Sequence, residues 1–374
     1  MATSTRPATR RIAYLSLQAV VQGQDTWAAV LEVIRGMREA GCDVDEWFVR
    51  YPTDTPPNPL ARLVAMWRVQ RRLARQIRDY DALYVRGHVL AAYASWAARK
   101  RGVPVIVECN GSYEDLFVAW PATRIARPLF EAVARSDLRN ADAVVSVTPQ
   151  LAEWVRSETG RMDSDVSPNG ANIETFSPAA PRRPGLPARY AVFFGQFAPW
   201  QGIRVIIDAL DTPGWPPELS LVFVGDGALR ADVEGVAAND GRVIYLGRLP
   251  YGEVAGVVAG AVASIVPMFE PARAATGLSP LKVYESMACG TPVIVSDTAG
   301  LADLVTSEKC GLVVEPGDPA ALAGALRRII DEPDLASEMG RLGREAVVQR
   351  HSWAVRARER LGVVERAIGS RARG

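Results

Sequence analysis

Short, continuous apolar runs alternate with longer amphipathic stretches from residue 11 onward. The first part of the chain predicts strands at 11–17, 43–49, 82–85, 103–108 and 143–147, and helices at 26–40, 60–78, 89–101, 125–139 and 149–158. Strands that are apolar throughout are buried on both faces, which is typical of a parallel sheet covered by helices. The pattern therefore predicts an α/β fold.

A proline-rich segment at 177–190 interrupts this alternation and is predicted to be an interdomain linker. The alternation then resumes, with strands at 191–195, 219–225, 243–246, 263–267 and 293–296, helices at 202–210 and 228–237, a helix before each of the last two strands, and a helical region after 318. A chain of 374 residues exceeds the usual limit of one core. We therefore expect two Rossmann-like domains, at 1–180 and 181–351, with ligand sites at the carboxyl ends of their strands.

Composition narrows the class of protein. The net charge of +1 gives no support to nucleic acid as a partner. The four cysteines are far apart and form no CxxC pair, which favours reduced thiols in a cytoplasm over disulfides or zinc. The N-terminus lacks the apolar core of a signal peptide, and the longest apolar run, 254–269, is too short to span a bilayer. A cytoplasmic enzyme is the expectation.

The most informative polar residues lie in a loop and helix that begin at residue 277. Ser279 is a natural N-cap and Pro280 suits the first helical position. The backbone N–H groups of Leu281 and Lys282 are then expected to face the preceding loop, where a helix start attracts phosphate. Glu285 lies further along the same helix, where its carboxylate can accept hydrogen bonds from a vicinal diol such as a ribose. The segment is therefore expected to bind a nucleotide diphosphate.

From Glu285 to Ser296 the sequence ESMACGTPVIVS resembles the donor-binding segment of retaining glycosyltransferases of family 4, which have the GT-B fold. The resemblance implies that the two domains face a central cleft and that a last helix, at about 352–374, crosses back to the N-terminal domain. It also implies transfer of a hexose-type sugar from a nucleotide-diphosphate sugar with retention of configuration. In that mechanism the acceptor hydroxyl attacks on the side from which the diphosphate leaves, and the departing phosphate takes the proton. The nucleotide sugar is the donor substrate, and no cofactor is implied.

The chain departs from the family pattern upstream of Glu285. The family has a glutamate at a position that Gly277 occupies in this chain. The nearest upstream acid is Glu270, which follows a predicted strand and is the candidate for contact with the donor sugar. Gly277, Leu278 and Ser279 remain the expected donor-binding loop.

Two cations that relatives direct at the pyrophosphate are replaced by Gln196 and Gln201. Glutamine donates a hydrogen bond but supplies no charge, whereas a diphosphate leaving group needs its developing negative charge stabilised. Lys282 is the expected compensating cation, since the helix dipole disfavours a lysine that is merely solvated in the first turn.

Two other segments of the second half resemble donor contacts in the same family. Gly225, in Val-Gly-Asp-Gly, either lets the backbone approach a ligand or only forms a turn. Arg248 and Leu249 resemble the segment whose backbone contacts the nucleobase, and an ordinary exit from a strand is the alternative.

The N-terminal half offers three candidates at predicted strand ends. Gly23 corresponds to the glycine-rich first loop of the family, which approaches the cleft. Asn110 takes the place of a histidine that contacts the donor sugar in many relatives. His88 is the third candidate, with a structural role as its alternative.

Metal chemistry is not expected. Asp43-Val44-Asp45 matches the Asp-x-Asp metal motif of the other large glycosyltransferase fold, but it lies in an alternating strand that continues with Trp47 and Val49. The chain has only two histidines, which argues against a histidine metal site and a Ser-His-Asp triad.

The predicted helix at 60–78 contains six arginines and no acid, with large apolar residues at helical spacing. The simpler interpretation is a core-facing helix with a solvated basic back. The alternative is a peripheral contact with the inner face of an anionic membrane, which would bring the enzyme to a lipid-linked acceptor.

The acceptor is expected to be a hydroxyl of a glycan, a lipid-linked glycan or a small molecule. A catalytically silent GT-B partner subunit is the alternative function, because the first family glutamate and both cations are missing. A nucleotide-sugar epimerase or hydrolase is disfavoured, since no second acid or histidine pair is placed for water attack.

Overall fold

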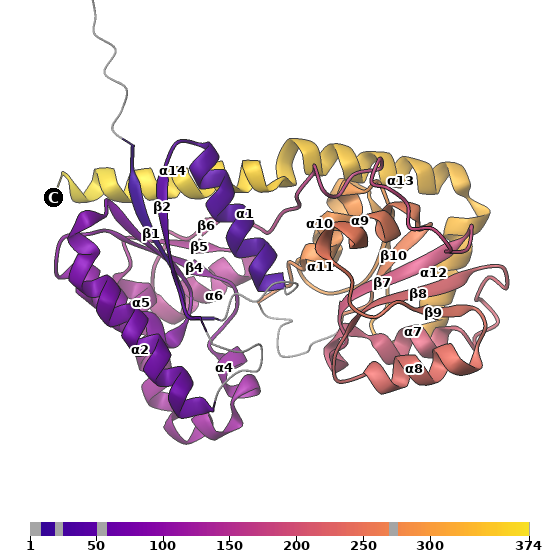
Figure 1. Ribbon diagram of the computed structural model, residues 1–374, viewed down its shortest axis with the longest axis horizontal. Helices are drawn as coiled ribbons and strands as arrows, with labels where there is room; N and C mark the ends of the chain where they lie inside the picture. Colours follow the sequence, from indigo (N-terminus) through magenta and orange to yellow (C-terminus); the bar gives the residue numbers. More distant parts are fainter. Residues whose placement is uncertain (1–8, 19–24, 51–57, 269–275, 374) are drawn as a thin grey trace, which may run out of the picture. The chain divides into compact units, whose positions relative to one another are not determined.

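The computed structural model describes residues 9–18, 25–50, 58–268 and 276–373. It divides into two compact units (Figure 1). The first unit is Met1–Pro168 together with Arg356–Gly374, and the second unit is Asn169–Val355. Each unit is built around its own parallel β-sheet, which confirms the predicted α/β fold with two Rossmann-like units.

The first unit contains a six-stranded parallel sheet in the order β2-β1-β3-β4-β5-β6. Its strands are β1 (Arg11–Ser16), β2 (Asp43–Phe48), β3 (Ala82–Arg86), β4 (Val105–Cys109), β5 (Ala143–Ser146) and β6 (Asp165–Val166). Its helices are α1 (Asp25–Glu39), α2 (Pro59–Gln76), η1 (Ile77–Asp79), η2 (Val89–Ala91), α3 (Ala92–Arg99), α4 (Glu114–Ala119), η3 (Pro121–Ala126), α5 (Arg127–Asn140), α6 (Pro149–Thr159) and most of α14 (Trp353–Arg371).

Side-chain alternation along the strands builds the core of the first unit. Ala13 and Leu15 of β1 belong to a buried cluster with Leu73 of α2 and Leu138 of α5. Along α2 the buried residues are Met66, Gln70, Leu73 and Ala74. Their spacing forms one stripe of the helix, so α2 faces the core on one side, as an amphipathic helix should.

The chain leaves the first unit after Pro168 and returns to it at Arg356, within α14. The return of the C-terminal helix agrees with the family resemblance. The first crossing lies upstream of the boundary expected at residue 180, because the proline-rich segment packs on the second unit. Ala180 is buried in the core of that unit, and Arg183 pairs with Glu253 at 2.7 Å.

The second unit contains a six-stranded parallel sheet in the order β12-β11-β10-β7-β8-β9. Its strands are β7 (Tyr190–Gln196), β8 (Ser220–Asp226), β9 (Val243–Tyr245), β10 (Ala263–Val266), β11 (Val293–Ser296) and β12 (Gly311–Val314). Its helices are η4 (Pro199–Gln201), α7 (Ile203–Ala209), α8 (Arg230–Asn239), α9 (Tyr251–Gly260), α10 (Leu281–Ala288), α11 (Leu301–Glu308), α12 (Pro319–Asp331), α13 (Pro333–Ala346) and the π-helical turn η6 (Val347–His351).

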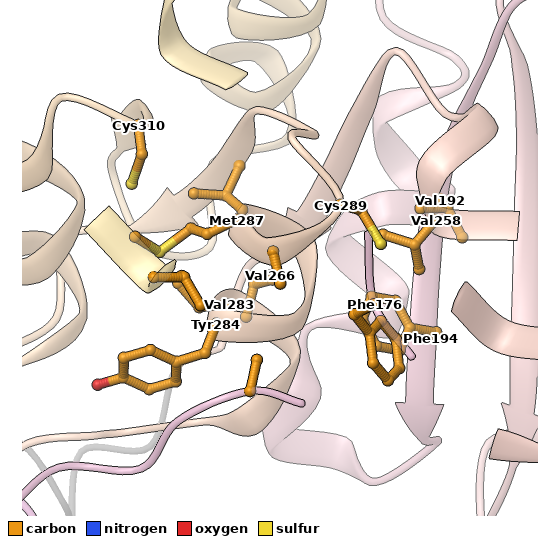
Figure 2. Packing of buried hydrophobic residues seen from close by; sticks show 14 of the residues in the cluster. Phe176, Val192, Phe194, Val258, Val266, Val283, Tyr284, Met287, Cys289 and Cys310 are labelled. Carbon is orange, nitrogen blue, oxygen red and sulfur yellow. The ribbon is translucent and has the colours of Figure 1, made fainter. Parts of the chain in front are cut away.

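Two buried clusters cover the two faces of the second sheet. Phe194 of β7 lies in a cluster with Val283 and Met287 of α10 (Figure 2). Phe193, the neighbouring residue of β7, belongs instead to a cluster with residues of α7 and α12, among them Leu326. All eight residues of α10 are buried, so the orientation of this helix is fixed by packing.

The strand order places the candidate site. In the second unit the chain adds β8 and β9 on one side of β7 and then places β10 on the other side. Ligands of open α/β sheets bind outside the carboxyl ends of the strands at such a reversal of strand order. The segments that follow β7 and β10 are therefore the expected position of a ligand. The helix that follows β10 is α10.

Candidate functional site

The first turn of α10 differs from the sequence prediction. The helix begins at Leu281, and its N-cap residue is Pro280, with φ −72° and ψ 135° and no side-chain cap. The Ser279 hydroxyl accepts a hydrogen bond from the backbone N–H of Asn169 at 3.2 Å, and the Asn169 side-chain amide donates to the Ser279 carbonyl at 2.6 Å. The prediction that Ser279 caps the helix was wrong, because its hydroxyl anchors the start of the second unit instead.

Lys282 joins the start of α10 to the end of β7. Its side chain is buried, and Nζ donates a hydrogen bond to Gln201 Oε1 at 2.6 Å. The same Nζ lies 4.4 Å from the centroid of the Phe193 ring, a cation–π distance. Lys282 and Gln201 are therefore in contact: the amide oxygen accepts from the ammonium, and the ammonium lies at the switch point of the sheet.

Glycine permits this close approach at the end of β7. Gly195 has φ +121°, and a Cβ atom there would lie 3.1 Å from Lys282 Nζ. At the neighbouring strand end, a Cβ on Gly225 would lie only 1.9 Å from the Gly195 carbonyl oxygen. The Gly225 N–H donates to Gly247 at 2.8 Å, and its carbonyl accepts from the Tyr245 hydroxyl at 3.1 Å. Gly225 therefore permits the close approach of β7 and β8, and its two hydrogen bonds join β8 to β9 and the residues that follow β9.

Glu285 lies three residues after Lys282, so both side chains belong to one face of α10. Glu285 is buried, and its Oε1 accepts a hydrogen bond from the Tyr251 hydroxyl at 2.9 Å. The Tyr251 ring in turn meets Phe176 edge-on, with ring centroids 5.0 Å apart. The carboxylate is thus oriented by a tyrosine that the sequence interpretation had not identified.

The other predicted donor-binding residues of the second unit range from buried to exposed. Gly277 has φ +69°, and the N–H of the buried Leu278 donates to the Ala299 carbonyl at 2.9 Å. Leu281 is buried, Leu249 packs against the core, and Gln196 is exposed at the end of β7. The exposed Arg248 pairs with Asp226 at 3.4 Å. Glu270 and Gly23 lie outside the described residues.

In the first unit, Asn110 belongs to a buried ionic cluster around Glu108. Asn110 Nδ2 donates to Glu108 Oε1 at 2.9 Å, and Arg86 pairs with the same oxygen at 3.0 Å. Tyr84 donates to Glu108 Oε2 at 2.6 Å, and Arg360 Nε, from α14, lies 3.2 Å from that oxygen. Burial raises the pKa of Glu108, but the guanidinium groups of Arg360 and Arg86 outweigh it, so the pKa is lowered. The carboxylate therefore stays charged and holds Asn110 at the end of β4.

His88 caps a short helix. Its Nδ1 accepts a hydrogen bond from the Leu90 N–H at 3.2 Å at the start of η2. Burial, with the nearby positive charge of Arg62, lowers the pKa of His88 to about 4. The imidazole is therefore neutral at pH 7, and its acceptor nitrogen is used by the backbone.

Neither a cluster of metal ligands nor a disulfide is present in the described part of the chain. Among the described residues, no group of three or more His, Cys, Asp or Glu side chains is placed to hold a metal ion. Asp45 accepts hydrogen bonds from Arg11 and Tyr80, which agrees with a strand face rather than a metal motif. Burial raises the pKa of Cys109 and Cys289 to about 12, so these thiols are protonated at pH 7. No described helix is long and apolar enough to span a bilayer.

Comparison with protein families agrees with this architecture. Residues 188–332 match the family described as glycosyl transferases group 1, and residues 20–170 match the glycosyl transferase 4-like domain.

Named relatives are glycosyltransferases. The chain is 29% identical to the 2-deoxystreptamine glucosyltransferase of Streptomyces kanamyceticus over 73% of each chain. It is 28% identical to the D-inositol 3-phosphate glycosyltransferase of Acidothermus cellulolyticus, over 78% of this chain and 68% of that protein.

Solved structures support the fold. Sucrose-phosphate synthase from Thermosynechococcus elongatus superimposes with a TM-score of 0.78 at 23% identity, over 96% of this chain and 99% of that one. Anabaena Alr3699/HepE, in complex with UDP and glucose, gives a TM-score of 0.69 at 16% identity, over 96% of this chain and 99% of that one. With the two family matches and the two parallel sheets, these results identify the chain as a glycosyltransferase of the GT-B fold.

Proposed function

We propose that the protein is a retaining glycosyltransferase of family 4 that transfers a hexose-type sugar from a nucleotide-diphosphate sugar to a hydroxyl group. The acceptor would be a glycan, a lipid-linked glycan or a small molecule. The observation that carries the proposal is the buried Lys282 ammonium, which lies at the end of β7 beside Gly195 and Gln201. A cation held at this point supports the binding of a diphosphate.

The diphosphate, the ribose and the nucleobase of the donor are each assigned to residues of the second unit. Lys282 and the first backbone N–H groups of α10 would contact the diphosphate, since both the charge and the helix dipole favour an anion there. Gln196 and Gln201 would add neutral hydrogen bonds. Glu285 would accept hydrogen bonds from the ribose hydroxyls, because its carboxylate lies on the same face of α10 as Lys282 and is oriented by the Tyr251 hydroxyl at 2.9 Å. Arg248 and Leu249 would border the nucleobase.

The chemical step would use positioning and charge stabilisation. The acceptor hydroxyl attacks the anomeric carbon on the face from which the diphosphate leaves, and the departing phosphate accepts its proton. Lys282 stabilises the negative charge that develops on the leaving group. Glu270 and Asn110 are proposed to contact the donor sugar, and His88 is proposed to lie at the edge of the cleft. No metal ion is part of this proposal.

Two relatives bear on the donor. One is named a glucosyltransferase, and the structure of HepE has been solved with UDP-glucose. These names support a nucleotide sugar as the donor for this chain as well. A cytoplasmic location is part of the proposal, because the four cysteines are free thiols, which suits a reducing compartment.

A thermal-shift panel tests donor binding. UDP-, GDP-, ADP- and TDP-sugars are added separately, and one nucleotide is expected to raise the unfolding temperature, because a ligand that binds only the folded state stabilises it. The same sugar nucleotide is then incubated with candidate acceptors with and without EDTA, and NMR assigns the anomeric configuration of the product. No shift with any nucleotide sugar, an inverted product, or activity lost in EDTA would each contradict a part of the proposal.

A further inference from the structure

The outward side of α2 exposes large apolar side chains that the core does not use. The exposed fraction is 72% for Leu60, 49% for Leu63, 39% for Val64 and 50% for Trp67. Their spacing repeats at three and four residues, so they lie on one side of the helix, next to the buried stripe that contains Met66. We call this set the outer face of α2.

Arginines continue the outer face toward the end of the helix. Arg71 and Arg75 follow Trp67 at four-residue spacing, and both are exposed. The Arg71 guanidinium lies 4.9 Å from the centroid of the Trp67 ring. The helix contains no acidic residue, and within the described part of the chain neither Arg71 nor Arg75 forms an ion pair. The outer face therefore joins an apolar end to a basic end.

The apolar end extends beyond α2. The Arg62 guanidinium lies 4.7 Å from the centroid of the Trp120 ring, which brings an exposed tryptophan next to the helix. Ten of the fourteen exposed large hydrophobic side chains of the described residues lie between Leu60 and Leu129, and the other four are Met162, Val166, Val313 and Val348. Exposed hydrophobic side chains that lie next to one another, as Leu60, Leu63, Val64 and Trp67 do on α2, mark an interaction surface rather than scattered exposure.

We propose that the outer face of α2 lies on the surface of an anionic lipid bilayer. Leucine and tryptophan side chains partition into the interface between headgroups and acyl chains, and nearby arginines are attracted to anionic headgroups while their stems remain apolar. A second copy of the chain fits the face less well, because an antiparallel symmetric contact would place the arginines of one helix against the apolar side chains of the other. Nucleic acid would match the arginines but leave the four apolar side chains in water. The proposal goes beyond the donor chemistry and does not depend on it.

Vesicle co-sedimentation of the full chain tests the charge. The protein is expected to sediment with vesicles of phosphatidylcholine and phosphatidylglycerol at about 0.1 M salt, and much less at about 0.5 M or with phosphatidylcholine alone. The double variant Arg71→Gln and Arg75→Gln should bind about twentyfold more weakly. The matched control is Arg328→Gln with Arg341→Gln, which removes two exposed arginines from α12 and α13 and should bind like the wild type.

A second pair of changes tests insertion of the apolar end. Leu60→Ser with Leu63→Ser leaves every charge in place and should also weaken binding, and brominated lipid should quench the fluorescence of the wild type more than that of Trp67→Phe. Equal thermal unfolding temperatures show that the variants are folded. Absence of sedimentation at low salt, or equal loss in the α12 and α13 control, overturns the proposal. If vesicle binding is unchanged by the leucine substitutions and is displaced by a nucleic-acid competitor, the proposal is overturned in favour of a surface that binds polyanions in general.

Discussion

Lys282 keeps a positive charge inside the second unit, where loss of water is costly unless the charge has partners. Its contacts with Gln201 Oε1 and the Phe193 ring are a neutral oxygen and an aromatic face. Both contacts favour an ammonium, and both lie at the end of β7, where the diphosphate is proposed to bind. This combination explains why a first-turn lysine, which the helix dipole disfavours, can stand at this position.

Removal of this charge should abolish most turnover. We expect Lys282→Ala to lose most activity, and Lys282→Met, which keeps an unbranched apolar stem, to bind donor about ten- to a hundredfold more weakly, the usual range for a lost hydrogen bond to a charged group. Donor titration and initial rates provide the measurement. Lys100→Ala, an exposed lysine of the first unit, is the control. Near-normal turnover and donor affinity in both Lys282 variants would exclude the assigned role.

Gly195 should matter for the same ammonium. In Gly195→Ala the backbone would be strained at φ +121°, and the new methyl group would lie 3.1 Å from Lys282 Nζ. Gly41→Ala is the matched control, since Gly41 has φ +94° and no atom within 4 Å of the added Cβ. Urea denaturation should show that both variants lose about 1–3 kcal/mol of unfolding free energy. Only Gly195→Ala should also lose donor affinity, and equal affinities in the two variants would contradict the assignment.

Sequence resemblance pointed to some of the residues of this region and missed others. The replacement of two expected cations by glutamines pointed to Lys282 as their substitute, and the structure places it on Gln201. Tyr251 and Arg360 were missed, because their partners Glu285 and Glu108 are remote in the sequence and no local pattern signals the contact. Ser279 was misassigned for a related reason: its distant partner Asn169 competes with the helix cap that local sequence favours.

At the level of elements, hydrophobic periodicity was most successful for long segments. Both units show the alternating strands and helices that the pattern predicted, and α2 shows the expected buried stripe. β12 and the two-residue β6 were not predicted. β12 is a partly exposed edge strand of four residues, and its apolar run, 312–314, is shorter than the four to eight residues that mark a strand.

The short helix η2 provides a test that depends on pH. The pKa of His88 falls from 6.5 to about 4 in the folded protein. Between these values the unfolded chain binds a proton that the folded chain does not, so the free energy of unfolding should rise with pH across this window. Above pH 6.5 the contribution is complete, and it is lost as the pH falls toward 4.

His88→Asn isolates this contribution, because asparagine offers an oxygen to the Leu90 N–H and does not titrate. Urea denaturation at several pH values should show a smaller loss of stability on acidification in the variant than in the wild type. The difference between the two curves removes the titration of all other groups. Parallel curves between pH 6.5 and 4 would show that His88 titrates in the folded protein as it does in the unfolded chain.

At the scale of the whole molecule, the sequence predicted two α/β units and the return of the C-terminal helix, and both are present. The return is fixed by chemistry that no pattern of apolar residues shows. Arg360 is fully buried in the first unit, where it meets Glu108 and donates to the Ser167 carbonyl at 3.2 Å. A buried arginine in a helix that also carries exposed arginines cannot be recognised from periodicity alone.

The two units should respond differently to a nucleoside diphosphate. The assigned donor contacts lie in the second unit, on the segment after β7 and at the start of α10. Backbone N–H groups that donate to a ligand exchange with solvent more slowly, because opening must first break the new contact. Hydrogen exchange measured with the diphosphate that gives the largest thermal shift should therefore slow most at 195–203 and 277–283. The same ligand should have little effect on these segments in Lys282→Met, since the charge that attracts the diphosphate is absent. Slower exchange confined to the first unit would place the nucleotide elsewhere, whereas equal protection in Lys282→Met would separate nucleotide binding from the charge of this lysine.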